Sequence, residues 1–268
     1  MEGLLDGATE LRVVIIGAGM SGILSSIKMT ESGYHNHVIY EKSDQLGGTW
    51  RDNTYPGISC DVPAHGYTYS FEPNPNWSQT FAPGPEIKEY FERVADKYNV
   101  RKNIRFNESV NYCAFEDGRW TIRTTAGREE RADIVIAATG VLHIPYTAPI
   151  NGLERFQGSS FHSSRWDHSV DLVGKKVGVI GTGSTAIQIT SAIAHKVEKF
   201  NLFQRTAQWV MPIENEMYSA EDKMNFKDSD NLDVVVNQIH QDFDLSLIHI
   251  SEPTRPERIS YAVLCLKK

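Results

Sequence analysis

Two glycine-rich turns are the parts of this 268-residue sequence whose residue types and spacing could do chemistry. The first is Gly17-Ala18-Gly19-Met20-Ser21-Gly22, which fits the pattern G-x-G-x-x-G. In that pattern the first glycine permits a tight turn, the second lets the backbone approach a pyrophosphate, and the third lets helix and strand pack closely. The N–H groups at the start of the following helix then bind the pyrophosphate. The pattern alone is weak evidence, so its context decides.

The context of the first turn is that of a strand–turn–helix–strand unit. The apolar run Leu11–Ile16 before it predicts a buried parallel strand, and Ile23–Ser32 and His37–Glu41 predict a helix and a second strand. Glu41 lies nineteen residues after Gly22. A carboxylate at this point accepts hydrogen bonds from ribose hydroxyls and repels a 2′-phosphate. This unit is therefore predicted to bind FAD or NAD and not NADP.

The second turn, Gly181-Thr182-Gly183-Ser184-Thr185-Ala186, repeats this arrangement with alanine in place of the third glycine. The strand Lys176–Ile180 is expected before it, and a helix and the strand Phe200–Arg205 after it. Arg205 lies nineteen residues after Ala186, so a base occupies the place that an acid holds in the first unit. A guanidinium suits a 2′-phosphate. We therefore expect an α/β chain with two Rossmann-like, three-layer domains, the first binding FAD and the second NADP(H).

The remaining elements are read from periodicity and turn residues. Gly47 to Phe81 is rich in Gly, Pro, Asn and aromatic residues and is expected to be mostly loop. Glu86–Tyr98 has the pattern of an amphipathic helix. Two antiparallel strands, Arg105–Phe115 and Arg119–Thr125, are expected to meet at Asp117-Gly118, and Asp133–Ala137 predicts a further buried strand.

Composition excludes several functions. The net charge of −7 argues against nucleic acid as a partner, and no run approaches the ~18 apolar residues of a membrane span. The acidic N-terminus lacks the pattern of a signal peptide, and the three distant cysteines offer neither a disulfide framework nor a redox pair. A reduced, cytoplasmic protein is the expectation. His35-Asn36-His37 has a metal-like spacing but no supporting Cys or carboxylate, so no metal site is predicted.

Several motifs resemble those of the Baeyer–Villiger monooxygenases. Phe156 to Asp167 matches the family fingerprint F-x-G-x-x-x-H-x-x-x-W-[P/D] at every fixed position, just before the second turn. The flavin-side loops of the family resemble Gly47-Gly48-Thr49-Trp50 and Tyr55–Asp61, and its NADP-side strand end resembles Phe203-Gln204-Arg205-Thr206 with Gln208-Trp209. The resemblance covers roughly Leu11 to Asp244 and implies that the second domain is inserted in the first.

The resemblance also implies an activity. NADPH would bind at the second turn and pass hydride to FAD; the reduced flavin would capture O₂ as a C4a-peroxide that attacks a ketone, and rearrangement would give an ester or lactone. Asp61 would lie near the flavin and orient an active-site arginine, for which this chain offers no candidate. The other two candidate catalytic positions, His162 and Trp166, would couple the domains rather than act as acid or base.

The last residues, LSLIHISEPTRPERISYAVLCLKK, break with what precedes them and resemble the translation of a sequencing adapter. A genuine C-terminal helix or linker is the alternative. The expected division is an FAD-binding part at 1–150, an incomplete NADP-binding domain at 151–244 and a non-native tail at 245–268. Such a tail should pack weakly and leave the apolar residues of Leu11–Ile16 or Lys176–Ile180 incompletely covered.

Two alternative functions stay open. Flavin monooxygenases that oxidise nitrogen and sulfur carry Tyr or Phe where Trp166 stands, so Trp166 and Asp167 favour the Baeyer–Villiger class. The chain could also be a non-catalytic remnant that at most binds FAD. A dithiol reductase with two dinucleotide sites would need paired redox cysteines, which are absent.

Overall fold

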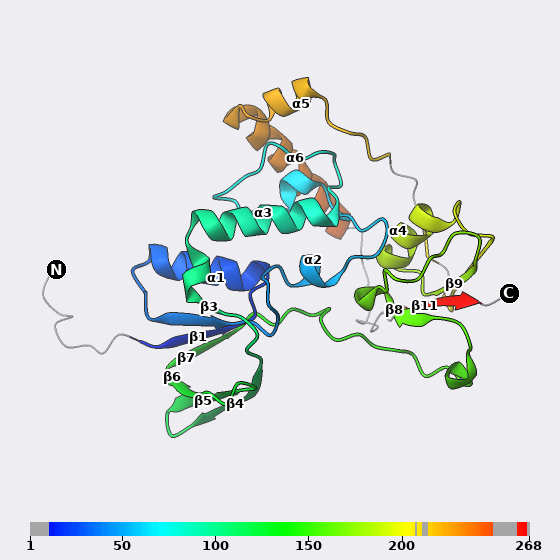
Figure 1. Ribbon diagram of the computed structural model, residues 1–268. Coiled ribbons are helices and arrows are strands. Elements are labelled where there is room, and N and C mark those ends of the chain that lie inside the picture. Colours follow the sequence, from blue (N-terminus) through cyan, green and yellow to red (C-terminus); the bar gives the residue numbers. More distant parts are fainter. Residues whose placement is uncertain (1–10, 207, 211–213, 249–261, 267–268) are drawn as a thin grey trace, which may run out of the picture. The chain divides into compact units, whose positions relative to one another are not determined.

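The computed structural model describes residues 11–206, 208–210, 214–248 and 262–266. The chain forms two compact units, the first comprising Met1–Arg51 and Lys88–His143 and the second Asp52–Ile87 and Ile144–Lys268 (Figure 1). It passes between them within helices α2 (Thr49–Asp52) and α3 (Gly84–Lys97). The division expected from the sequence places residues 52–87 with the first unit, whereas their contacts group them with the second.

A parallel sheet forms the centre of the first unit, with the strand order β3-β2-β1-β7. Its strands are β1 (Val13–Ile16), β2 (His37–Tyr40), β3 (Ile104–Arg105) and β7 (Ile134–Ala137). Except for the half-buried Ile16, the β-branched residues of β1 and β2 are buried, as expected for parallel strands covered on both faces. The prediction of a buried strand at Asp133–Ala137 is wrong in its burial, because the residues of β7 are half-buried or exposed. Helix α1 (Met20–Glu31) connects β1 to β2, which confirms the first predicted strand–turn–helix–strand unit.

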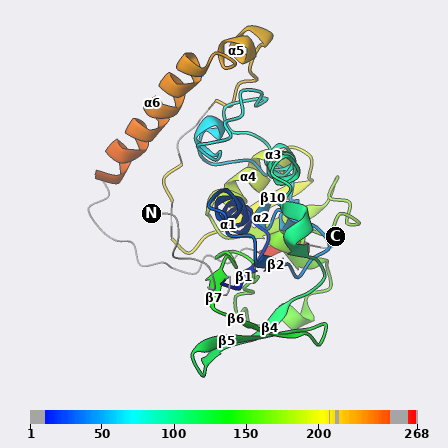
Figure 2. The same ribbon diagram turned by 90° about the vertical axis from the view of Figure 1, so that its left-hand side faces the viewer.

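A three-stranded antiparallel sheet covers one face of this parallel sheet, opposite α1 (Figures 1 and 2). It consists of β4 (Val110–Glu116), β5 (Arg119–Thr124) and β6 (Glu129–Ala132). Ile122 and Ala132 pack against Val14, Val38 and Tyr40 of the parallel strands. Side chains alternate along a strand, so the other residues of β1 and β2 face the helical layer.

The predicted hairpin at Asp117-Gly118 is confirmed, since both residues have positive φ (50° and 77°) and β4 and β5 pair on either side. Positive φ at both central residues is typical of the two-residue turn that matches strand twist. The predicted start of the first strand at Arg105 is wrong. Ile104–Arg105 instead pairs in parallel with β2, and β4 begins only at Val110.

The amphipathic helix predicted at 86–98 is α3, whose side chains Ile87, Tyr90, Phe91 and Val94 are buried. The loop-rich stretch before it contains the short α2 and a 3₁₀ turn, η1 (Ala64–Gly66). A second 3₁₀ turn, η2 (Val100–Asn103), leads from α3 into β3.

The sheet of the second unit has the order β10-β9-β11-β8. Its strands are β8 (Ser160–His162), β9 (Lys176–Ile180), β10 (Lys199–Phe203) and β11 (Ala262–Leu266). Helix α4 (Ser184–Ile193) connects the parallel pair β9 and β10, which confirms the second predicted unit. The 3₁₀ turns η3 (Leu153–Arg155) and η4 (Ser163–Arg165) flank β8, and helices α5 (Ala220–Asn225) and α6 (Ser229–Ile248) follow β10.

The expectation that Leu11–Ile16 or Lys176–Ile180 stays incompletely covered holds only at the ends of these segments, where Leu11 is exposed and Ile16 and Ile180 are half-buried. Val14 and Ile15 of β1, and Val177 and Val179 of β9, are fully buried. Strand β11, from the segment expected to pack weakly, pairs antiparallel with both β9 and β8. Within the described ranges, no helix is both long and apolar enough to cross a membrane.

Candidate functional site

The first glycine turn joins β1 to α1, and two of its glycines are required by packing. Gly17 has φ +103° and donates its N–H to the Tyr40 carbonyl at 2.8 Å. A Cβ on Gly17 would lie 2.5 Å from the Ala138 carbonyl oxygen at the end of β7. A Cβ on Gly22 would lie 1.9 Å from the Gly17 carbonyl oxygen, so α1 passes too close to the turn for a larger residue.

Gly19, the middle glycine, is different, because nothing in the protein needs its space. It precedes the first residue of α1, with extended φ and ψ and no side-chain cap. A Cβ there would meet only the Gly48 Cα, at an ordinary contact distance of 3.7 Å. Gly48 itself has φ +52°, and its own Cβ would come within 3.2 Å of the Gly19 Cα. The uncapped helix start beside two glycines fits the close approach of a pyrophosphate.

Glu41, directly after β2, is 4% exposed and its carboxylate already has protein partners. Its Oε2 accepts the Ala18 N–H at 2.8 Å, and its Oε1 accepts from the Ser43 N–H and from Arg51 Nη1, both at 3.0 Å. Four acceptor positions are available on a carboxylate, so one on Oε2 remains for a ribose hydroxyl. The ion pair with Arg51, itself mostly buried, offsets the negative charge of Glu41 that was predicted to repel a 2′-phosphate.

Arg51 is the residue at this site that sequence reasoning missed. It lies in α2, immediately after the motif residues Gly48, Thr49 and Trp50, and also donates to the Gln45 carbonyl. Thr49 is exposed and Trp50 is half-buried. The sequence signal for this ion pair is the position of Arg51 directly after the glycine-rich loop and ten residues after Glu41.

The second turn repeats the backbone geometry of the first. Gly181 has φ +122° and donates its N–H to the Phe203 carbonyl at 2.9 Å, as Gly17 does to Tyr40. Gly183 precedes α4 with extended φ and ψ and no side-chain cap, and the exposed Ser184 begins the helix. Ala186 is fully buried, so this turn tolerates a methyl group at its third position.

The strand register shifts the comparison between Glu41 and Arg205 by one residue. Ile16 pairs with Tyr40, and Ile180 pairs with Phe203, so the residue that corresponds to Glu41 is Gln204. Arg205 follows it, and Arg205 and Thr206 are both exposed. The neutral Gln204 does not repel a phosphate, and the exposed Arg205 next to it attracts one.

The loop around Tyr55 packs on α4, the helix that follows the second turn. The Tyr55 hydroxyl donates to Gln188 Oε1 at 2.9 Å, and Gln188 Nε2 donates to the Ser59 carbonyl at 3.1 Å. A Cβ on Gly57 would lie 2.6 Å from the Gln188 carbonyl oxygen. Burial raises the pKa of Tyr55, which a hydrogen bond to Thr185 lowers in part. Gln188 was not singled out from the sequence.

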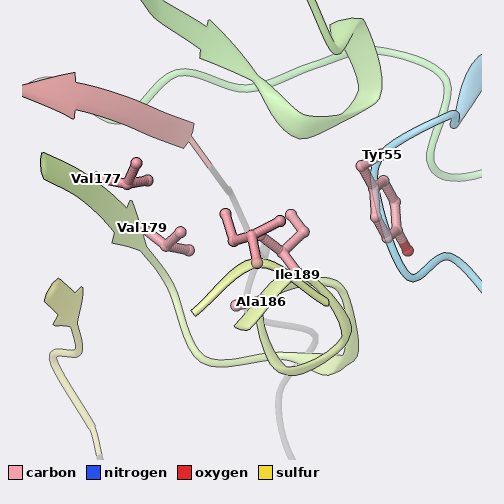
Figure 3. Close-up of a cluster of buried hydrophobic side chains, with 6 residues drawn as sticks. Tyr55, Val177, Val179, Ala186 and Ile189 are labelled. Atoms are coloured by element: carbon pink, nitrogen blue, oxygen red, sulfur yellow. The ribbon is translucent and has the colours of Figure 1, made fainter. Parts of the chain in front are cut away.

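Tyr55 also completes the hydrophobic core beneath this turn (Figure 3). The core combines it with strand residues of β9 and helix residues of α4: Val177, Val179, Ala186, Ile189 and Ile193. Trp166 and Phe161 pack against this cluster and meet edge to face, with ring centroids 5.2 Å apart. The fingerprint residue Trp166 therefore has a packing role in the second unit.

His162, the fingerprint histidine, is the N-cap residue of the 3₁₀ turn η4. Its Nδ1 accepts the Ser164 N–H at 3.1 Å, so the ring proton of the neutral form is on Nε2. Burial lowers the pKa of His162, and the charge of Arg165 lowers it further. Asp61, the remaining candidate catalytic residue, is exposed beside the buried Cys60. His37, from the rejected metal pattern, instead bonds Ser26 and Asn103.

Comparison with known proteins gives consistent similarities. Residues 10–227 match the sequence profile of a family described as flavin-binding monooxygenase-like. An uncharacterized monooxygenase of Mycobacterium tuberculosis is 51% identical over 207 residues, which are 77% of this chain and 42% of that protein. A Baeyer–Villiger monooxygenase of Streptomyces coelicolor is 46% identical over 205 residues, 76% of this chain and 39% of that protein.

A solved structure is similar over the same part of the chain. Cyclohexanone monooxygenase from Rhodococcus, bound to NADP⁺, superposes with a TM-score of 0.74 at 35% identity, covering 81% of this chain and 42% of that one. The chain thus spans about two fifths of the length of the relatives it matches.

Proposed function

Because the chain belongs to the flavin-binding monooxygenase-like family, we propose that it provides the FAD- and NADP-binding turns of an NADPH- and O₂-dependent monooxygenase. The proposed reaction inserts oxygen next to a ketone carbonyl to give an ester or lactone. The observation that carries the proposal is the pair of glycine turns with the same backbone geometry but different residues at the ends of their second strands.

The first turn is proposed to bind FAD. Gly19 and Gly48 leave the start of α1 open to a pyrophosphate, and the free acceptor position on Glu41 Oε2 suits a ribose hydroxyl. Thr49 and Trp50 are the neighbouring flavin-side residues. FAD bound there would supply the electron transfer and the O₂ chemistry, while the protein binds, orients and excludes water.

The second turn is proposed to bind NADPH. The pyrophosphate would lie against Gly181, Gly183 and Ser184, at the uncapped start of α4. Arg205 would bind the 2′-phosphate, with Thr206 beside it, because both are exposed directly after the strand end. The ion pair of Glu41 with Arg51 and the neutral Gln204 mean that selectivity for NADPH rests on Arg205.

Three further residues have proposed roles in the complete protein. Asp61 is proposed to orient an active-site arginine supplied by residues outside this chain, and its exposure leaves its carboxylate accessible. His162 and Trp166 are proposed to fix the segment before the second turn, as their contacts within η4 and the core support. The separated cysteines support a cytoplasmic location.

We propose that residues 1–150 and 151–244 are parts of two domains and that residues 245–268 are a non-native tail. Strand order supports it, because β7 lies parallel beside β1, whereas β11 lies antiparallel at the corresponding place beside β9. A doubly wound sheet has a parallel strand there. Sequencing the transcript beyond Asp244 tests this: an in-frame continuation other than LSLIHIS is expected, and the same residues in the transcript would refute it.

The activity is tested with the complete protein, supplied with NADPH, O₂ and a panel of ketones, thioethers and amines. We expect NADPH oxidation coupled to an ester or lactone product from at least one ketone. Products from thioethers or amines alone would assign the protein to the nitrogen- and sulfur-oxidising monooxygenases. Flavin binding without any oxygenated product would refute the activity but leave the assignment of the first turn to FAD intact.

A further inference from the structure

A basic pocket in the first unit lies away from the glycine turn. It has a volume of about 220 Å³ and is lined by Arg12, His37, Lys102, Asn103 and Arg105 together with two apolar residues. These residues come from three separate places in the sequence: the residue before β1, the start of β2, and the passage from η2 into β3. We define this set of five residues as the basic pocket.

No residue of the glycine turn lines the basic pocket, although one pocket residue, Arg105, pairs with Tyr40 near the end of β2 and accepts the Glu41 N–H at its carbonyl. Arg12 and His37 are at the ends where β1 and β2 begin, whereas Gly17 follows the last residue of β1. Arg12 and Gly17 are five residues apart along an extended strand, which corresponds to roughly 16 Å at about 3.3 Å per residue. A ligand bound beside Arg12 and His37 would therefore not overlap a dinucleotide bound at the turn.

Two of the three positive side chains of the basic pocket have no carboxylate partner among the described residues. Arg12 forms an ion pair with Glu130 at 2.5 Å and donates to Asn36. Within the described part of the chain, neither Lys102 nor Arg105 forms an ion pair with a carboxylate. Three cations thus surround one hollow in a protein whose net charge is −7. A cleft lined by one sign of charge concentrates the field and attracts counter-ions.

His37 forms a fixed, neutral wall of the basic pocket. It is 5% exposed, and its Nδ1 donates to the Tyr34 carbonyl at 3.1 Å. Its Nε2 therefore accepts hydrogen bonds, from the Ser26 hydroxyl at 2.8 Å and from Asn103 Nδ2 at 2.9 Å. This arrangement holds the Asn103 amide in place at the pocket wall.

Nearby positive charges act on His37 in addition to its burial. Burial lowers the pKa of His37, the bond to the Tyr34 carbonyl opposes this, and the nearby charges of His35, Arg12 and Lys102 lower the pKa further. Arg12 and Lys102 therefore both act on the interior of the basic pocket. A bound anion would offset their charges and raise the pKa of His37.

We propose that the basic pocket binds a small oxyanion, namely the phosphate or carboxylate group of a metabolite. Guanidinium and ammonium groups form charge-assisted hydrogen bonds with such groups, and no described carboxylate forms a competing ion pair with Lys102 or Arg105. The site is separate from the dinucleotide turns, so the proposal does not depend on the monooxygenase activity.

The test is a titration of the isotopically labelled 268-residue chain with inorganic phosphate or succinate, followed by NMR at the His37 ring and the Asn103 amide. Sodium chloride at matched ionic strength is the control for screening. Saturable shifts with phosphate or succinate, accompanied by a rise in the pKa of His37, are expected. Shifts of equal size with chloride, or no saturation, would overturn the proposal.

Variants separate the pocket from general surface charge. Lys102→Gln with Arg105→Gln should weaken phosphate binding at least tenfold, while Lys227→Gln, an exposed lysine of the second unit, should leave it unchanged. Each variant is checked for an unchanged melting temperature, and the single substitutions replace the pair if the double variant unfolds. Equal affinity in the pocket variants and in Lys227→Gln would refute the assignment.

Discussion

The first glycine turn allows a matched pair of substitutions, one expected to affect folding and the other expected to affect ligand binding. Gly22→Ala adds a methyl group where the nearest atom, the Gly17 carbonyl oxygen, is 1.9 Å away. Gly19→Val adds a side chain where the nearest protein atom from its Cβ is 3.7 Å away. The structure therefore predicts that Gly22→Ala impairs folding and that Gly19→Val impairs only binding.

The cost of Gly22→Ala follows from the contact. The new carbon would be about 1.5 Å short of ordinary contact with the Gly17 oxygen, so α1 must shift away from β1. Overpacking of this kind lowers the free energy of unfolding by about 1–3 kcal/mol, occasionally more. The better helix propensity of alanine offsets up to about 1 kcal/mol of this loss. A net loss of about 2 kcal/mol would lower the melting temperature by roughly 4–8 °C.

The cost of Gly19→Val falls on the ligand. The φ of −81° at Gly19 is one that any residue adopts, so the backbone needs no change. A valine side chain would occupy the space left for the pyrophosphate beside the start of α1. Loss of one charge-assisted hydrogen bond of about 1.5–3 kcal/mol already weakens binding roughly tenfold or more.

The assay measures both properties on the same samples of the complete protein. Flavin occupancy comes from the ratio of flavin to protein absorbance after gel filtration, and stability from thermal unfolding of the flavin-free protein. Ala186→Gly, at the third position of the second turn, is the comparison in which a buried methyl group and helix propensity are lost without overpacking. Gly19→Val with wild-type flavin occupancy, or Gly22→Ala with wild-type stability, would show that the reasoning from these contacts is wrong.

Four further outcomes are expected. Arg205→Ala should weaken NADPH binding by about 1.5–3 kcal/mol and leave NADH little changed, as measured by fluorescence titration; equal losses would exclude a 2′-phosphate role. Arg51→Ala should destabilise the protein to urea by about 3–5 kcal/mol, because it leaves the buried Glu41 carboxylate without its cation, whereas a loss under 1 kcal/mol would refute this pairing. Gln188→Ala should raise the KM for NADPH more than it lowers kcat, since it frees the Tyr55 loop from α4; an effect on kcat alone would contradict this. Burial lowers the pKa of His65 from 6.5 to about 4, so the free energy of unfolding should fall by about 2 kcal/mol between pH 7 and pH 5. His65→Phe should remove this fall, as measured by urea unfolding at the two pH values.

The local elements of the fold were predictable because their signals are local. The apolar runs of β1 and β9, the glycines that follow them and the Asp117-Gly118 turn each lie within a few residues of the structure they specify. The amphipathic spacing of α3 likewise needs no distant partner. Helix α5 was overlooked although Ser219 and Asp222 form a capping box, a signal that the sequence does contain.

Features that depend on distant contacts were not predictable in the same way. The pairing of Ile104–Arg105 with β2 depends on the return of the chain after α3, sixty residues later. The Tyr55–Gln188 hydrogen bond joins residues 133 positions apart, and no periodicity reports it. The correspondence between Gln204 and Glu41 required the strand register, because Glu41 lies 24 residues after Gly17 (41 − 17) and Gln204 lies 23 residues after Gly181 (204 − 181).

For the residue after the second strand, solvent exposure matters more to coenzyme selectivity than the sign of its charge. Glu41 is buried, binds the Ala18 N–H of its own turn and is neutralised by Arg51, so it supports the turn as much as it faces a ligand. Arg205 is exposed, one residue further along, after a neutral Gln204. Discrimination by charge requires a group that a ligand phosphate can reach without first breaking a buried ion pair. Coenzyme selectivity should therefore respond to substitutions at Arg205, and substitutions at Glu41 should first affect stability.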